Sequence, residues 1–450
     1  MTITRTLIDH AAAITYDAIP ETARAVARHC ILDWFGCAIA GSREPLTNIL
    51  IDELAADESG ASTLVARTEL ATPLTAALIN GAMSHALDYD DTHTLMSGHP
   101  SAPVVPAALA LAERDDRDGA AFLAAVVAGI ETECRLGAIV NPGHYALGFH
   151  ATGTLGTFGA AAASAHLLDL DADRWTHAFA LAGTQAAGLK SAFGTMAKPL
   201  HAGRAASNGL LAAMLARGGF TGANDIVETA QGFASTHGAG EIDASRLDAL
   251  RGRWLIADTL FKYHASCYLT HAALDAATRL RIEASITPDS IESVEVRAST
   301  GCMGVCDLPE PATGLEGKFS LRATTAMALL GDDTSDPAAF NDARMRDPAF
   351  VVMRDRITFV PTPGLPATRA TVVVRVDGRD LAAEADSGTP EVDLERQSAR
   401  LHAKFLALAA PVVGADRADE VVAALDRIDD ARSLRGIASL ARDDAAVAAR

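Results

Sequence analysis

The sequence contains few aromatic residues, and its apolar residues are mostly small. Phe, Trp and Tyr make up 5% of the 450 residues, whereas 49% of the chain is hydrophobic, largely Ala and Leu. Ala and Leu favour helices, and small side chains let helices pack closely. The composition therefore favours a helical protein over a β-sandwich or a barrel. The length predicts two or three domains.

Basic residues are in the minority. The chain has 38 Lys and Arg against 57 Asp and Glu, which gives a formal net charge of -19. Such an acidic protein is poorly suited to bind nucleic acid or an anionic membrane surface. Any local cluster of basic residues is therefore informative.

Cysteines and long apolar runs are also scarce. The six cysteines are scattered, with no Cys-x-x-Cys pair and no zinc-ligand spacing, which is typical of a reduced, intracellular protein. The first residues lack a basic segment followed by an apolar run, so we predict no signal peptide. No apolar run reaches about 18 residues, so we predict no transmembrane helix. The expected location is the cytoplasm.

Hydrophobic periodicity divides the chain into three parts. Apolar residues recur at helical spacing to about residue 265, for example over residues 21–40, where Gly41 is expected to cap the helix. Beyond about residue 285 the pattern changes to that of half-buried strands, over residues 290–299, 356–361 and 367–376. One helix is expected between them, over residues 319–330. Helical periodicity then returns.

This organisation predicts a fold that is mainly α with an α/β insertion. We expect a large all-helical domain formed by residues 1–266 and 393–450. A smaller α/β lid domain is expected over residues 267–392.

The segment ALDYDDTHTLMSGHPSAP, residues 86–103, holds three Asp and two His. Asp88 shares a face with His85 if the preceding helix continues, and Ser101 is expected to cap the next helix. His99 would then lie in the loop between two helix ends. Asp and His are ligands for zinc, iron or manganese, but this spacing matches no standard metal motif. A metal site, an acid–base site and an ordinary capped turn all remain open.

Two further segments place basic residues at helix starts. His150 precedes a helix whose first turns contain Thr and Gly, and amides at such a start can bind a carboxylate. Lys198 stands just before Pro199, the expected first residue of another helix, and His201 and Arg204 follow on one face of it. In an acidic chain this cluster indicates an anion site. A capping histidine and a solvated helix face are the alternatives.

A fourth segment lies where the helical and α/β parts are expected to meet, a usual location for a site. It contains Lys262, His264, Cys267 and His271. A Cys–His pair for nucleophilic catalysis is one interpretation, although closeness in sequence says little about a dyad.

Taken in order, these segments resemble the MmgE/PrpD family, which includes 2-methylcitrate dehydratase, cis-aconitate decarboxylase and an iminodisuccinate epimerase. The resemblance covers nearly the whole chain. The motifs that carry it are CILDWFGCAIAG at 30–41, LDYDDT at 87–92, GHP at 98–100, GFH at 148–150, KPLHAG at 198–203 and THA at 270–272. Their combination is specific to the family but not to a substrate.

The resemblance implies a large helical domain with a smaller α/β lid, a homodimer, and chemistry without a metal or organic cofactor. The positions that match the family's pocket are Asp88, Thr92, His99, His150, Lys198 and Lys262. Two departures argue against decarboxylation. The cis-aconitate decarboxylase has a His where this chain has Cys267, and a Tyr beside the lid helix where this chain has Ala323.

We therefore predict a cofactor-independent hydro-lyase, similar to 2-methylcitrate dehydratase, that removes a proton next to a carboxylate of a small di- or tricarboxylate. Epimerisation or isomerisation of a dicarboxylate is the alternative, and decarboxylation or non-catalytic carboxylate binding is less favoured. The predicted catalytic residues are His99, His150, Lys198 and Asp88, and the predicted substrate-binding residues are Thr92, His201, Arg204, Lys262, His264 and Cys267.

Overall fold

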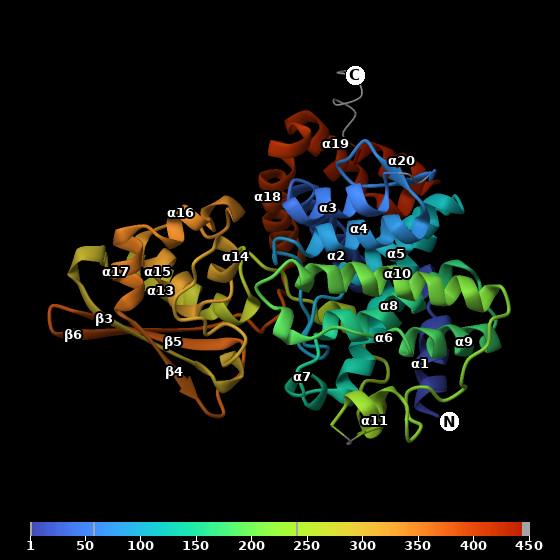
Figure 1. The fold of residues 1–450 in the computed structure, drawn as a ribbon, viewed down its shortest axis with the longest axis horizontal. Helices are drawn as coiled ribbons and strands as arrows, with labels where there is room; N and C mark the ends of the chain where they lie inside the picture. The colour runs from blue at the N-terminus through green and yellow to red at the C-terminus, as the bar shows by residue number, and fades with distance from the viewer. Residues whose placement is uncertain (1, 57–58, 240–241, 443–450) are drawn as a thin grey trace.

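The computed structural model describes residues 2–56, 59–239 and 242–442 and consists of a larger helical part and a smaller α/β part (Figure 1). The predicted fold class, mainly α with a small sheet-containing part, is confirmed. None of the helices that these residues form is long and apolar enough to cross a membrane.

The helical part is built around α8 (Ala151–Leu167) and α10 (Ala197–Arg217), which pack against each other and against several neighbours. Nearly every residue of α8 is buried, because Gly, Ala and Thr let other helices approach it from most sides. The other elements of this part that precede the α/β part are α1 (Ile3–Ala12), α2 (Glu21–Gly41), α3 (Pro45–Leu54), the short strands β1 (Ser62–Thr63) and β2 (Leu70–Ala71), α4 (Pro73–His85), α5 (Ser101–Arg114), α6 (Gly119–Val140), α7 (Gly143–Ala146), α9 (Ala172–Gly183), α11 (Phe233–His237) and α12 (Ser245–Ala249).

Gly41 is the last residue of α2 and not its cap, which corrects the sequence-based expectation. Ser42 follows it with a right-handed backbone. The reason for glycine is the close approach of α4, because a Cβ at Gly41 would lie 2.0 Å from the carbonyl oxygen of Met83.

The α/β part contains a four-stranded sheet in the order β4-β3-β5-β6, with helices over one face (Figure 1). Strand β3 pairs in parallel with β4 and antiparallel with β5, and β6 pairs antiparallel with β5. Along β5 every second side chain is buried beneath α13. The elements are α13 (His271–Glu283), β3 (Ile291–Ser299), α14 (Gly314–Gly317), α15 (Leu321–Leu330), α16 (Asp342–Met345), α17 (Pro348–Asp355), β4 (Ile357–Thr362), β5 (Arg369–Val376) and β6 (Arg379–Asp386).

The chain returns to the helical part at α18 (Leu394–Val413), which packs along α2. Two further helices, α19 (Ala415–Leu425) and α20 (Leu434–Leu440), follow it. The α/β part is therefore bracketed in sequence by segments of the helical part. The first junction lies beside the loop between α4 and α5, where Lys262 donates to the Asp88 carbonyl.

Adding a methyl group at Gly41 is expected to destabilise the protein, because it would collide with the backbone of α4. Gly41→Ala should lower the free energy of unfolding, measured by urea denaturation, by about 1–3 kcal/mol or more, the usual cost of overpacking. The matched control is Gly436→Ala in α20, where no described atom lies within 4 Å of the added methyl. Alanine's helix propensity should make the control slightly more stable. Unchanged stability of Gly41→Ala would contradict the close packing of α2 on α4.

Candidate active site

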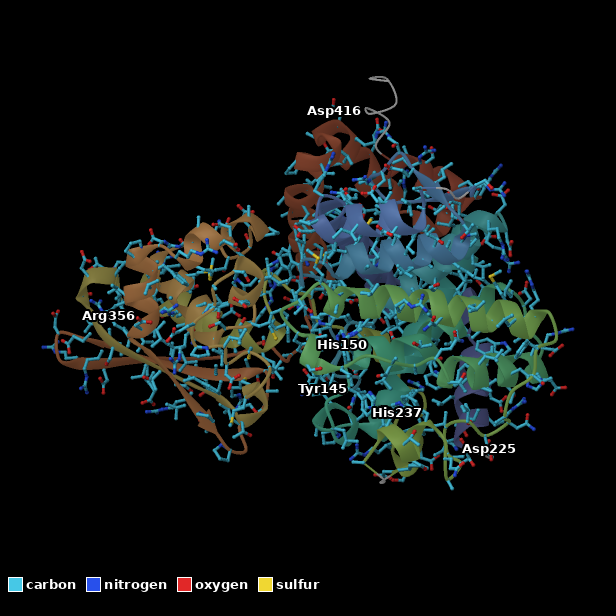
Figure 2. The ribbon with its side chains drawn as sticks, in the orientation of Figure 1. Tyr145, His150, Asp225, His237, Arg356 and Asp416 are labelled. Atoms are coloured by element: carbon cyan, nitrogen blue, oxygen red, sulfur yellow. The ribbon has the colours of Figure 1, made fainter. Side chains whose placement is uncertain are left out.

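The helical and α/β parts together line a cavity of about 510 Å³. Figure 2 shows His150 and Tyr145 on the side of the helical part that faces the α/β part. Six of the predicted site residues line this cavity: Asp88, Thr92, His99, His150, Lys198 and Cys267. They come from the loop between α4 and α5, the starts of α8 and α10, and the segment before α13.

The Asp88 carboxylate is buried and held by two lysines. Lys198 donates a short hydrogen bond to Oδ1, and Lys262 Nζ lies 3.1 Å from the same oxygen. Burial alone would raise the pKa of Asp88, but these two ammonium groups outweigh it and hold the pKa well below its ordinary value. Asp88 is therefore an anion, and each lysine beside it is part of a buried ion pair.

The loop that carries Asp88 is not a continuation of α4, contrary to one sequence-based expectation. Helix α4 ends at His85, and Asp88 adopts a left-handed backbone with φ of 52°. Three consecutive carbonyl oxygens, those of residues 87, 88 and 89, each accept a hydrogen bond from a different buried lysine. Lys318 donates to the first at 2.7 Å, Lys262 to the second at 2.8 Å and Lys404 to the third at 2.6 Å.

A hydrogen bond to the backbone fixes the tautomer of His99. Its Nδ1 lies 2.7 Å from the carbonyl oxygen of Asp91 and donates to it, since a carbonyl can only accept. The other nitrogen, Nε2, keeps its lone pair and lies 3.7 Å from Asp88 Oδ1. Burial, opposed by the Asp90 carboxylate, lowers the pKa of His99 well below its ordinary value. His99 is therefore neutral and able to accept a proton at Nε2.

The other acidic residues of the loop are structural. Asp90 accepts from His85 Nδ1 at 2.9 Å, and both side chains are buried. Asp91 accepts from the amide and the hydroxyl of Ser101, so Asp91 caps α5 and Ser101 is its first residue, not its N-cap. The Thr92 hydroxyl donates to the carbonyl of Gly98 at 3.0 Å, which holds the turn that presents His99.

His150 immediately precedes α8, as predicted, and makes no capping bond. Its Nδ1 lies 3.1 Å from Nδ1 of His201. Its ring also stacks against that of His85 at a centroid distance of 5.7 Å. Burial, reinforced by the positive charge of Lys198, lowers the pKa of His150 well below its ordinary value.

Several cavity residues were not predicted from the sequence. The Lys190 ammonium lies 3.9 Å from the centre of the Tyr145 ring and donates to the Tyr145 carbonyl. The rings of Phe193 and Phe319 lie 5.5 and 5.1 Å from the Lys198 ammonium. Isolated Lys, Tyr and Phe residues carry no motif, so only the fold identifies them as cavity residues.

Two models of one protein family match this chain. Residues 5–244 match the MmgE/PrpD N-terminal domain, and residues 264–428 match the MmgE/PrpD C-terminal domain. The chain belongs to the MmgE/PrpD family. It is similar to the cis-aconitate decarboxylase of Aspergillus terreus, with 29% identity over 351 residues that cover 73% of this chain and 72% of that protein. It is also similar to the human cis-aconitate decarboxylase, with 26% identity over 423 residues that cover 90% and 87% of the two chains.

Four predicted substrate-binding residues of this MmgE/PrpD protein lie outside the cavity lining. His201 and Arg204 line a second cavity, because the face of α10 that they share points away from Asp88. His264 lies in a cleft on the far side of the junction, where its ring nitrogens bond Thr334 and Asp275. Lys262 is fully buried beneath the cavity and acts through Asp88.

The two departures from the cis-aconitate decarboxylase fall at different places. Cys267 lines the cavity, and a hydrogen bond with Cys306 lowers its pKa. Ala323 is fully buried in the first turn of α15 and is not part of the cavity wall. Of the two residues, only Cys267 lines the cavity.

The loop also brings together a set of groups that could hold a metal ion. Ligand atoms of His85, Asp88, Asp90 and His99 all lie within 4.8 Å of one another. However, two lysine ammonium groups already contact Asp88, and they would repel a divalent cation placed beside it. The donor set therefore fits proton transfer better than metal binding.

The geometry predicts which basic residue of α10 binds an anion. Lys198→Met should abolish the thermal stabilisation that citrate gives, because Lys198 lines the cavity of about 510 Å³. Arg204→Met is the matched control on the same helix, and it should keep the citrate effect because Arg204 faces the second cavity. The measurement is the unfolding temperature against citrate concentration. Equal loss in both variants would contradict the assignment.

Proposed function

We propose that this protein is a cofactor-independent hydro-lyase that removes a proton next to a carboxylate of a small di- or tricarboxylate. The observation that carries the proposal is the pairing of two neutral histidines, His99 and His150, with the buried Lys198–Asp88 ion pair in one cavity. Dehydration needs a base for the proton, an acid for the leaving hydroxyl and a cation for the developing charge.

His99 is the proposed base. Its Nε2 carries the lone pair, and the imidazolium formed on proton uptake would lie near two carboxylates, 3.7 Å from Asp88 and 3.4 Å from Asp90. These anions stabilise the positive ring when the proton arrives. The same arrangement orients the imidazole before the reaction.

Lys198 is the proposed partner of the substrate carboxylate. Proton removal places negative charge on the carboxylate next to the reacting carbon, and a cation fixed in advance stabilises that charge without reorganisation. Lys198 is 4% exposed and lies against two aromatic rings, so water screens it little. Lys190, at the cavity wall, supplies a second cation for a substrate with two or three carboxylates.

His150 is the proposed acid for the leaving hydroxyl. It lines the cavity from the start of α8 and is only 2% exposed. None of the described residues forms a hydrogen bond with its Nε2, whereas its Nδ1 contacts His201. The nitrogen available to a substrate is therefore Nε2.

Decarboxylation of cis-aconitate is a second candidate, favoured by the names of the relatives. Loss of carbon dioxide leaves a carbanion that needs a cation and a proton donor, and the same cavity offers both. Cys267 argues against decarboxylation, because the resemblance implies a His at this position in the cis-aconitate decarboxylase. The two candidates differ in whether the acid group protonates an oxygen or a carbon.

A proton NMR experiment in deuterated buffer separates these reactions. Purified protein is incubated with 2-methylcitrate, citrate, cis-aconitate or iminodisuccinate. A hydro-lyase forms an alkene from a hydroxy acid, a decarboxylase converts cis-aconitate to a product that carries one deuterium, and an epimerase incorporates deuterium without net loss of substrate. Conversion of cis-aconitate to the decarboxylated product with one deuterium, with no alkene formed from the hydroxy acids, would replace the proposed dehydration by decarboxylation. Turnover of none of the four acids would contradict both.

Removing the proposed base should abolish turnover and leave the fold intact. His99→Gln is expected to lower kcat by about 10²–10⁴-fold, the usual contribution of a general base. The matched control is His402→Gln, because His402 lies on α18 and pairs with Asp426 away from the cavity. Rates are measured on the acid identified by NMR, with circular dichroism as the check on folding. A near-normal rate in His99→Gln would rule out its role as base.

The activity should persist at mildly acidic pH. Burial lowers the pKa of His99 below the ordinary histidine value of about 6.5. As the pH falls to that value the base therefore stays unprotonated. The decrease of kcat on the acid side of the profile, the acid limb, is expected at a lower pH. Because the Asp90 carboxylate raises the pKa of His99, Asp90→Asn should move that limb further toward acid. The measurement is kcat against pH for both proteins. A wild-type limb centred at or above pH 6.5 would be inconsistent with a buried base.

A further inference from the structure

The contact between His150 and His201 joins two separate cavities. His150 lines the cavity that contains Asp88, whereas His201 lines a second cavity of about 650 Å³ on the other side of the pair. The second cavity is open to solvent, because Arg204, Leu189 and Ser191 in its wall are exposed. The two Nδ1 atoms, 3.1 Å apart, connect the residues of the two cavities.

The backbone around the pair holds the rings in place. Gly188 has φ of 148°, and a Cβ there would lie 3.3 Å from His201 Nδ1 and 3.4 Å from His150 Cβ. The amide of His150 donates to the Gly188 carbonyl at 3.0 Å. On the other side of His201, a Cβ at Gly153 would lie 3.1 Å from the His201 Cβ. Glycine at these two positions therefore lets the neighbouring backbone approach both histidines closely.

Both rings are neutral at neutral pH. Burial lowers the pKa of His150 and that of His201, and the charges nearest them are cationic. His150 faces Lys198, His85 and His99, and His201 faces His85 and Lys198 as well as His150. Arg204, which lines the same cavity as His201, adds a further positive charge. Two neutral imidazoles in contact through Nδ1 must share one proton, so one ring donates and the other accepts.

A donor in the first cavity needs a source of protons while substrate is bound. His150 is 2% exposed even without a ligand, and a bound acid would separate it further from water in that cavity. His201 is only half-buried and reaches water from the opposite side. The route through His201 therefore stays open when the first cavity is filled.

We propose that His150 and His201 form a proton relay from the solvent-open second cavity to the substrate, an inference that rests on the proposed function. The His150 Nε2–H bond breaks as its proton passes to the substrate. His150 Nδ1 then takes the proton from His201 Nδ1. His201 Nε2 in turn takes a proton from water, and an acid of the buffer neutralises the hydroxide that is left. Each ring stays neutral and changes tautomer. The reverse transfer carries a proton outward and restores the pair.

The relay is tested by substitutions that separate hydrogen bonding from proton transfer. His201→Gln can still bond His150 Nδ1, but an amide cannot take up a proton at one atom and release one from another. We expect His201→Gln and His201→Ala to lower kcat by about tenfold or more, within the usual range for acid–base groups, with KM little changed. Added imidazole should enter the second cavity of His201→Ala and restore much of the rate.

The matched control is Asn208→Ala, because Asn208 lines the same second cavity and bonds the Gln185 carbonyl instead of a histidine. It should keep the wild-type rate, with no response to imidazole. A wild-type rate in His201→Gln would show that His201 only orients His150 and would overturn the relay. Failure of imidazole to restore His201→Ala would also overturn it.

A second measurement keeps the relay testable if none of the four acids is turned over. In protein labelled with ¹⁵N-histidine, a shared proton averages the ring nitrogen shifts of His150 between the two tautomers. His201→Gln should then fix His150 in one tautomer. A wild-type His150 fixed with its proton on Nδ1, and therefore with none to donate at Nε2, would exclude the relay whatever the substrate. Averaged shifts in a protein that turns over none of the four acids would instead contradict the proposed function alone.

Discussion

The buried loop at residues 87–89 is the constraint on which the site depends. Its three carbonyls and the Asp88 carboxylate are held by lysines that come from α10, from the junction before α13, from the α/β part and from α18. Buried charges are costly unless each is paired and hydrogen-bonded. The anion can therefore persist only when these distant segments are assembled around it, so formation of the cavity and docking of the α/β part are coupled.

This coupling explains how an acidic chain can present a cationic cavity. Lys404 bonds Asp33 at 2.6 Å, whereas the single Asp88 carboxylate is shared between the two ammonium groups of Lys198 and Lys262. Lys198 and Lys190 remain at the cavity wall, where a carboxylate can reach them. Burial keeps the neighbouring histidines neutral, so they can accept or donate protons without adding to the local charge.

Much of this arrangement could be predicted from the sequence, for identifiable reasons. Asp88, His99, His150 and Lys198 stand in short segments at helix ends, where residue type and spacing indicate chemistry. Lys318 and Lys404 could not be found this way, because each is a lone lysine, 231 and 315 residues along the chain from the carbonyl that it binds.

Hydrophobic periodicity did not predict every element and residue position correctly. Arg204 shares a helix face with His201, but the sequence cannot say which cavity that face lines. The strand β6 was missed because its sequence, RDLAAEAD, is rich in Ala and acidic residues and has no β-branched ones. At Gly41, a pattern typical of a helix cap instead reflects contact with another helix.

We propose that lysines, and not a metal ion, hold Asp88 and prepare the cavity for proton transfer. The direct measurement is turnover of the substrate identified by NMR after exhaustive treatment with EDTA and removal of the chelator. The account predicts an unchanged rate, with no gain on adding Zn²⁺, Mn²⁺ or Fe²⁺. A loss of turnover that one of these ions restores would contradict it and would assign His85, Asp88, Asp90 and His99 to a metal centre.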